Sequence, residues 1–130
     1  MAVSALLAVG VGAALGGVGR YALGQVLPTV GSSAEGFPYN TLAANLLGAL
    51  LIGLVWGLWR AEPWFIAWGR SFFVIGVLGG FTTFSALALE AVVLTEAGRS
   101  LTAIVYVLST TVLGILCTLL GYVLTRSVAS

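Results

Sequence analysis

The sequence contains no lysine, no aspartate and no histidine, and only a few charged residues of other types. Its charges are five arginines, Arg20, Arg60, Arg70, Arg99 and Arg126, and four glutamates, Glu35, Glu62, Glu90 and Glu96. Charged residues make up 7% of the 130 positions, whereas soluble domains have about 25%. So few charges would not cover the surface of a soluble domain. The composition therefore excludes a soluble enzyme, and a net charge of +1 predicts no binding to nucleic acid.

The lack of these residue types also excludes most kinds of metal site and catalytic site. The single cysteine, Cys117, excludes an intramolecular disulfide, and without histidine or aspartate the chain has too few ligands for a structural zinc site. General acid–base catalysis by histidine is unavailable as well. We therefore expect no catalytic residues.

Long uncharged runs are what the chain does have. Hydrophobic residues make up 60% of the sequence and the mean hydropathy is +1.14. Residues 1–19, 36–59, 71–89 and 100–125 carry no charge. Each run can supply the roughly 20 apolar residues that cross a bilayer. The first is not a signal peptide, because it lacks a basic start and Arg20 follows its apolar stretch. These runs predict an all-α membrane protein with four transmembrane helices.

We expect one four-helix transmembrane domain over residues 1–130. Its helices should cover about 3–26, 39–59, 70–96 and 100–125. Pro28 should end the first helix, and the turn-forming residues of 29–38 predict an exposed loop. Four tryptophans and two arginines between residues 56 and 70 are typical of a belt at the membrane surface.

The arginines give only a weak signal for orientation. With four spans, Arg60, Arg70 and Arg126 share one side of the membrane, and Arg20 and Arg99 lie on the other. The side of the membrane with more arginines is usually the cytoplasmic side. Because three arginines on one side against two on the other is a small difference, we predict that the chain inserts in both orientations. Two copies in opposite orientations would form an antiparallel homodimer. The alternative is a single orientation that other features decide.

The third expected helix contains a segment that is unsuited to a helix interior. Residues 79–83 read Gly-Gly-Phe-Thr-Thr, and adjacent glycines followed by β-branched residues disfavour helix. We expect the helix to be broken there, in the middle of the membrane, where freed backbone is tolerated only inside protein or beside water. The alternative is a continuous helix whose glycines pack closely against a neighbour.

Neutral hydrogen-bond donors line one face of the second helix and one face of the fourth. Thr41 and Asn45 lie one turn apart, as do Tyr106 and Thr110. Donors without a fixed negative charge can replace the water around an anion without trapping it. The alternative is ordinary hydrogen bonding between membrane helices, which contributes about 0.6 kcal/mol for each bond.

Three segments together resemble a known family. They are GGVGRY at 16–21, TLAANLLG at 41–48 and GGFTTFS at 79–85, and the chain is similar over its whole length to the small bacterial fluoride channels of the Fluc, or CrcB, family. The resemblance implies a passive, selective channel that exports fluoride across the bacterial inner membrane and relieves fluoride toxicity. It also implies an antiparallel dual-topology homodimer with two pores.

The resemblance assigns roles to individual residues. It implies a central sodium ion at the dimer interface, held by the backbone carbonyls of Gly79 and Thr82. It implies that the pore and its fluoride sites are formed by Thr41, Asn45, Phe84, Ser85, Tyr106 and Thr110, with Arg20 in the vestibule. Phe84 would meet the ion with its ring edge, which carries positive quadrupole charge.

Two positions depart from the family pattern, and two other functions stay open. Leu87 stands where the family commonly has a second phenylalanine, and Gly114 stands where it often has serine. A small proton-coupled multidrug or guanidinium exporter would need a titratable acid in its path, and Glu90 is the candidate because acids inside membranes are usually functional. An accessory subunit that transports nothing would need neither a broken helix nor the hydroxyls around it.

Overall fold

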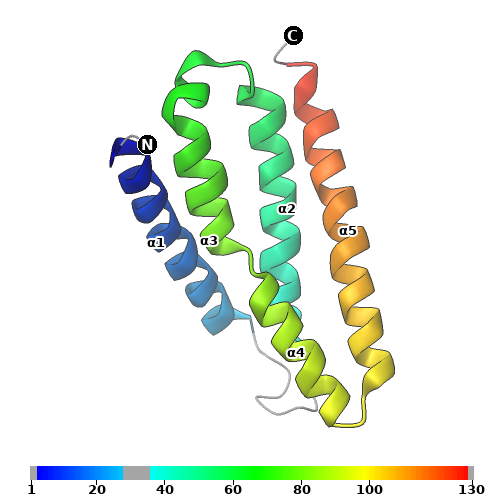
Figure 1. Ribbon diagram of the computed structural model, residues 1–130. Helices are drawn as coiled ribbons and strands as arrows, with labels where there is room; N and C mark the ends of the chain where they lie inside the picture. The colour runs from blue at the N-terminus through cyan, green and yellow to red at the C-terminus, as the bar shows by residue number, and fades with distance from the viewer. Residues whose placement is uncertain (1–2, 28–35, 129–130) are drawn as a thin grey trace.

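The structure, a computed structural model, describes residues 3–27 and 36–128, and all regular secondary structure in them is helical (Figure 1). Its helices are α1 (Val3–Val26), α2 (Tyr39–Trp59), η1 (Phe65–Leu78), α3 (Gly79–Phe81), α4 (Phe84–Glu96) and α5 (Ser100–Arg126). The expected loop at 29–38 lies mostly outside the described residues. Four helical segments are long and apolar enough to cross a membrane: Val3–Val26, Tyr39–Trp59, Phe65–Glu96 and Ser100–Arg126. They confirm the predicted all-α class with four membrane-length helices.

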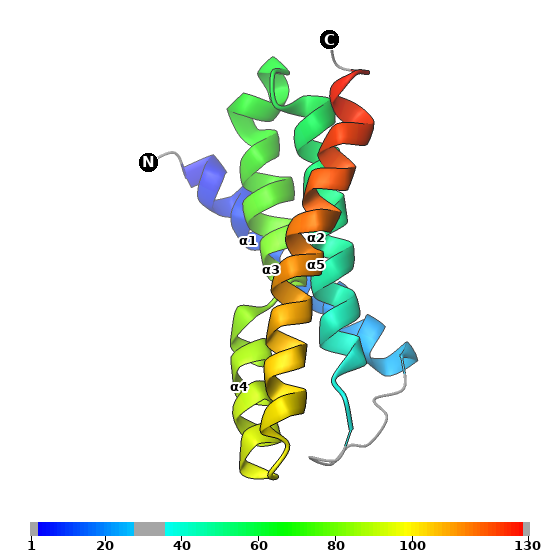
Figure 2. The same cartoon turned by 90° about the vertical axis from the view of Figure 1, so that its right-hand side faces the viewer.

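α2, α5 and the helices of the third span run along one long axis, and α1 crosses them at an angle (Figures 1 and 2). The start of α1 and the end of α5 lie toward the same end of the bundle. α2 packs along α5, and α1 packs along η1 and α3. α4 packs against α5, beside the half of α5 that is nearer its N-terminus. The other half of α5 packs against α2 but lies away from α4, and it lines an open groove.

Glycines let these helix pairs approach closely. In α1, a Cβ at Gly12 would lie 2.5 Å from the carbonyl oxygen of Phe72, and one at Gly16 would collide with the carbonyl oxygen of Val77. In α2, Gly53 faces the backbone of α5 in the same way. Small residues at this four-residue spacing allow backbone contact between membrane helices.

The third span begins earlier than the sequence analysis placed it. We expected its helix to start near residue 70, whereas η1 starts at Phe65 and helical structure begins at residue 63. Pro63 lies in this first turn, where a missing N–H leaves no helical hydrogen bond unmade. The tryptophans nearby pack together, with ring centroids 5.1 Å apart for Trp59 and Trp64 and 5.5 Å for Trp64 and Trp68. Ring packing therefore extends the helix through the aromatic belt.

The interruption between α3 and α4 is shorter than the 79–83 segment that we expected. Gly79 is helical, with φ −63° and ψ −36°, and α3 continues to Phe81. Only Thr82 (φ −81°, ψ 158°) and Thr83 (φ −150°, ψ 121°) are extended. Gly80 serves packing instead, since a Cβ there would lie 2.5 Å from the carbonyl oxygen of Ala13. The β-branched threonines, which favour extended backbone, form the interruption.

The buried core is small. Tyr106 and Phe65 are its largest fully buried side chains. Most large apolar side chains are exposed on the single chain, including Phe84, which is 80% exposed at the start of α4. Such a surface suits lipid or another protein rather than water.

Candidate functional site

The interruption is held by the side chain of Asn45 on α2. Its Nδ2 donates to the carbonyl oxygen of Thr83 (3.1 Å), and its Oδ1 accepts from the amide of Thr83 (2.8 Å). The carboxamide thus satisfies both backbone groups of an extended residue inside a membrane-length segment. Unsatisfied backbone groups in hydrocarbon cost several kcal/mol each, so this pair makes the interruption tolerable.

Two carbonyl groups lose their helical partners as a result. In a continuous helix the amide of Thr83 would donate to the carbonyl of Gly79, and that of Ala86 to the carbonyl of Thr82. The amide of Thr83 donates to Asn45 instead, and that of Ala86 donates to Oγ1 of Thr83 (3.1 Å), which caps α4. The carbonyls of Gly79 and Thr82 are therefore released from those helical bonds.

Arg20 satisfies a third carbonyl at the same place. Its Nε donates to the carbonyl oxygen of Gly80 over 3.3 Å, which would otherwise accept from the amide of Phe84. Arg20 also lines a recess of about 320 Å³ together with Tyr21, Gly24, Gln25, Asn40 and Thr41. The sequence analysis placed Arg20 in a vestibule, and the structure places it between this recess and the interruption.

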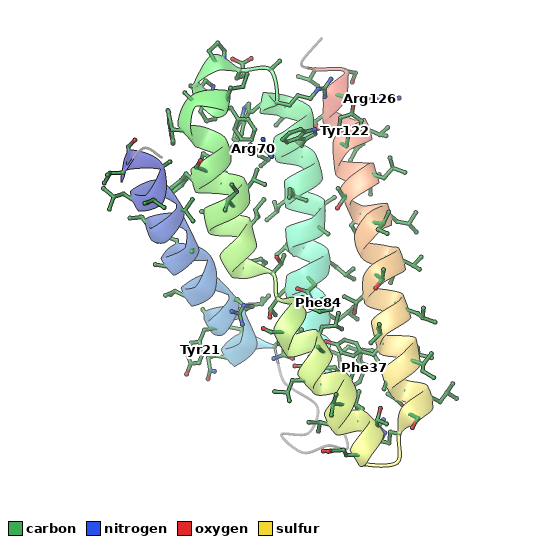
Figure 3. The ribbon with its side chains drawn as sticks, viewed as in Figure 1. Tyr21, Phe37, Arg70, Phe84, Tyr122 and Arg126 are labelled. Carbon is green, nitrogen blue, oxygen red and sulfur yellow. The ribbon has the colours of Figure 1, made fainter. Side chains whose placement is uncertain are left out.

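Three of the expected pore residues line one recess beside the interruption. This recess of about 240 Å³ is lined by Asn45, Thr82, Thr83, Phe84, Leu87 and Thr110. Phe84 lies near the middle of the bundle's length, on the side of Arg70 that is away from Tyr122 and Arg126 (Figure 3). Leu87, only 7% exposed, belongs to the core around Tyr106. It forms the apolar wall of the recess.

Thr41 and Tyr106 meet at a carboxyl group. The hydroxyl of Thr41 donates to Oε1 of Glu90 (2.7 Å), and that of Tyr106 donates to Oε2 (2.6 Å). The hydroxyl of Thr110 donates to the carbonyl oxygen of Tyr106, one turn earlier in α5 (2.8 Å). The sequence analysis treated these hydroxyls as donors for an ion. In the structure each already donates to protein.

The remaining expected residues lie in two other places. Ser85 is exposed, and its hydroxyl is 3.2 Å from that of Thr83. Gly79 and Thr82 line a second recess, of about 270 Å³, which they share with Asn45 and Thr118. The seven residues expected at the pore are therefore spread along the bundle, with Asn45 and Thr82 connecting the two recesses.

Three residues that matter here were not assigned sites from the sequence. Glu90 was considered only for the alternative exporter. Thr83 pairs with Asn45 and caps α4 through its hydroxyl. The hydroxyl of Thr118 donates to the carbonyl oxygen of Ala49 (2.9 Å). A helix-capping threonine before Phe84 was detectable by the usual N-cap rule. Thr118 continues the four-residue spacing of Tyr106 and Thr110 through Gly114.

Comparison with known proteins decides the family. The sequence model of the family described as "CrcB-like protein, Camphor Resistance (CrcB)" matches residues 7–122. The chain belongs to the CrcB family. The segments at 41–48 and 79–85 that carried the resemblance lie inside the matched residues, so that expectation is confirmed.

Relatives in the CrcB family have nearly the same length as this chain. The chain is 43% identical over 122 residues to a Thermus thermophilus protein named "Fluoride-specific ion channel FluC", with 94% of each chain covered. It is 39% identical over 116 residues to a Helicobacter acinonychis protein of the same name, covering 89% of this chain and 91% of the relative. A Nitratidesulfovibrio vulgaris protein, also so named, is 38% identical over 120 residues, covering 92% and 95%.

The paired hydrogen bonds of Asn45 predict a stability effect. Asn45→Ala leaves the amide and carbonyl of Thr83 without partners, and should lower the free energy of unfolding by about 1–3 kcal/mol. Asn45→Asp should cost more, because its carboxylate faces the Thr83 carbonyl. Unfolding of the purified protein in detergent by sodium dodecyl sulfate measures both. Ser85→Ala is the control and should stay within about 0.5 kcal/mol; an Asn45→Ala protein as stable as this control would contradict the bracing role.

Proposed function

We propose that the chain forms a passive, fluoride-selective channel in the bacterial inner membrane, which lets fluoride leave the cell and so relieves fluoride toxicity. Support comes from family membership and from relatives named as fluoride-specific ion channels. The single observation that carries the proposal is the recess at Asn45, Phe84 and Thr110, where neutral donors and an aromatic ring meet at an interruption of the third span. This arrangement suits ion passage, and no enzymatic role is proposed.

Fluoride would pass by exchanging partners with the protein. The ion is small and holds its hydration water tightly, so each step must offer hydrogen-bond donors. Asn45 Nδ2 carries two N–H groups and makes one hydrogen bond among the described residues, which leaves one N–H for the ion. A threonine hydroxyl that donates to its own helix can rotate, so Thr110 can turn from the Tyr106 carbonyl toward the ion. The hydroxyls of Thr41 and Tyr106 would likewise rotate, so that they donate to the ion instead of to the carboxylate of Glu90.

Phe84 would face the ion with its ring edge, where the aromatic quadrupole is positive. Its ring lines the recess but is 80% exposed on the single chain. One chain therefore builds only part of the ion's surroundings. The missing part would come from a second copy.

We infer an antiparallel homodimer for this reason. α4 covers one half of α5, through a core that includes Ala103 and Tyr106. The other half of α5, from Thr111 to Tyr122, lines an apolar groove of about 790 Å³ with α2 and η1. An inverted copy related by a two-fold axis near the interruption would bring its own α4 to this groove. The pairing would cover the open side of the groove, so that it becomes an enclosed passage, and would cover both copies of Phe84.

The residues also fit the sodium ion that the family resemblance implies. Hard cations take oxygen ligands, and the carbonyls of Gly79 and Thr82 have lost their helical amide partners beside a shared recess. These two carbonyls would hold the ion, together with their equivalents from the other copy. Bound sodium would supply positive charge that fixes the two interruptions to each other.

The exporter alternative has less support. It needs Glu90 as the acid that exchanges protons and substrate, and this carboxyl group already accepts hydrogen bonds from Thr41 and Tyr106. Relatives across the length of the chain are named as channels. Glu90 fits better as the acceptor that holds two donor hydroxyls in place until the ion arrives.

Ion efflux from liposomes tests the channel directly. Vesicles containing the purified protein are loaded with potassium fluoride or potassium chloride and diluted into an external solution free of both anions, and valinomycin is then added to carry potassium. Fluoride should leave rapidly while chloride stays inside, as measured with ion-selective electrodes. Protein-free vesicles give the background rate. Equal loss of the two anions, or no loss of fluoride, would remove the proposal.

The role of Phe84 has its own test in the same assay. Phe84→Leu should lower fluoride efflux by more than about 100-fold, equivalent to about 2.7 kcal/mol of barrier, because no ring edge then faces the recess. Phe72→Leu is the control and should conduct like the wild type, because Phe72 packs against Trp68 and Phe73 and does not line the recess. Leu87→Phe should conduct within about tenfold, since the recess beside it can accept the larger ring. Wild-type efflux by Phe84→Leu would exclude the ring-edge mechanism.

A further inference from the structure

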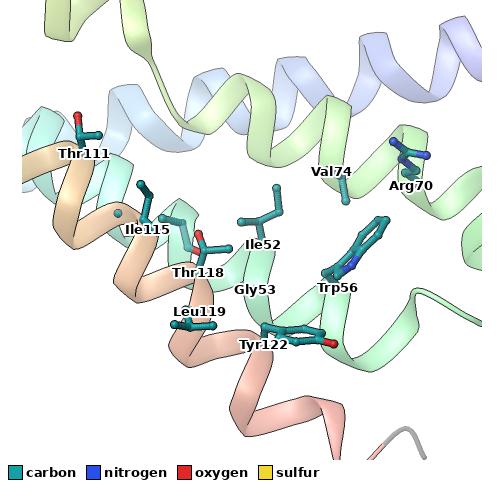
Figure 4. Close-up of a pocket in the computed structure, with 12 residues that line it drawn as sticks. Ile52, Gly53, Trp56, Arg70, Val74, Thr111, Ile115, Thr118, Leu119 and Tyr122 are labelled. Atoms are coloured by element: carbon teal, nitrogen blue, oxygen red, sulfur yellow. The ribbon is translucent and has the colours of Figure 1, made fainter.

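The recesses of the candidate site continue into the apolar groove. The recess at Phe84 and the recess at Gly79 share Asn45 and Thr82. The recess at Gly79 and the groove share Ala49, Ile52, Val74 and Thr118. The three cavities therefore adjoin one another and define a path along α5, from the interruption toward the end of the bundle where Tyr122 and Arg70 lie (Figures 3 and 4).

A positive charge stands at the far end of this path. Arg70, on η1, lines the groove, and its guanidinium lies over the ring of Trp56, 5.8 Å from the centroid. Within residues 3–27 and 36–128 it makes no ion pair with a carboxylate. Stacking on a ring leaves the N–H groups at the guanidinium edge available. Arg70 is thus a charge beside the path that has no carboxylate partner in the described part of the chain.

The other arginines at this end are placed differently. Arg60 and Arg126 both lie over the ring of Tyr122, at 5.3 and 6.0 Å, and neither lines the groove. At the opposite end, Arg20 lines the recess beside Thr41. Arg70 therefore borders the far end of the row of cavities. Arg20 lines a separate recess and reaches the interruption through its hydrogen bond to Gly80.

We propose that Arg70 collects anions at the second mouth of the pathway, as the counterpart of Arg20 at the first. The inference rests on the proposed fluoride channel and adds a residue to it. A positive charge at a narrow mouth raises the local concentration of anions and their rate of entry. Trp56 holds the guanidinium beside the groove and keeps it from turning toward the membrane surface. In an inverted dimer, each face of the membrane would present one mouth of each kind.

Neutralising Arg70 tests this role, and Arg60 supplies a matched control with the same charge loss at the same end. Fluoride efflux from liposomes is measured at an ionic strength of about 10 mM and again at about 300 mM, adjusted with an impermeant organic anion. Screening shortens the reach of a charge from about 30 Å to well under 10 Å over this range. Arg70→Gln should be slowed at least about threefold at low salt and much less at high salt. Arg60→Gln removes a charge that does not line the groove, so it should be slowed clearly less than Arg70→Gln at low salt. Arg70→Lys should keep most of the rate.

Charge rescue keeps the test informative if a glutamine variant folds poorly. Arg70→Cys on a Cys117→Ser background is modified with a thiol reagent that carries a permanent positive charge, or with a neutral reagent of similar size. The charged reagent should raise fluoride efflux and the neutral one should not. Equal rates for Arg70→Gln and Arg60→Gln, a deficit that salt does not change, or rescue by both reagents would overturn the inference. A wild-type protein that conducts no fluoride would instead refute the channel itself.

Discussion

The structure depends on one side chain, Asn45, that takes the place of two helical hydrogen bonds. Its carboxamide pairs with the amide and carbonyl of Thr83, so the backbone can leave the helix inside a membrane-length segment without unsatisfied groups. Because Thr83 is then extended, its hydroxyl can cap α4. The carbonyls of Gly79 and Thr82 are released for another ligand. The recess, the candidate cation site and the position of Phe84 all follow from this pairing.

Close helix contacts hold the interruption where Asn45 can reach it. A side chain at Gly48, one turn after Asn45, would collide with the methyl group of Thr82, and one at Gly80 would meet the backbone of α1. Arg20 then ties α1 to the carbonyl of Gly80. Both neighbouring helices thus approach the interruption through glycine and bond to it through a polar side chain. Close packing at the glycines and the hydrogen bonds of Asn45 and Arg20 together fix the position of the interruption.

The sequence predicted the spans well and the contacts less well. Uncharged runs of about 20 residues indicate membrane helices almost independently of packing, and the ends of α1, α2 and α5 lie near the expected residues. Glycines suggested the interruption, yet threonines form it: Gly79 and Gly80 are both helical, and Gly80 packs against the backbone of α1. The convergence of Thr41, Glu90 and Tyr106 comes from three helices. Their residue spacing within each helix does not reveal it. Phe84 was expected to face the ion with its ring edge, and in one chain its ring is 80% exposed.

An exposed Phe84 and an open groove lead to the central claim, that two oppositely inserted copies together complete the pathway. Single cysteines at exposed positions of opposite ends, Ala61→Cys and Ala97→Cys, each on a Cys117→Ser background, test it most directly. Whole cells are treated with a membrane-impermeant thiol reagent, and the labelled fraction is compared with that in permeabilised cells. The account predicts that both positions are labelled in part from outside, each in about the fraction of copies that faces outward. Complete labelling of one position with none of the other would show a single orientation and contradict the account.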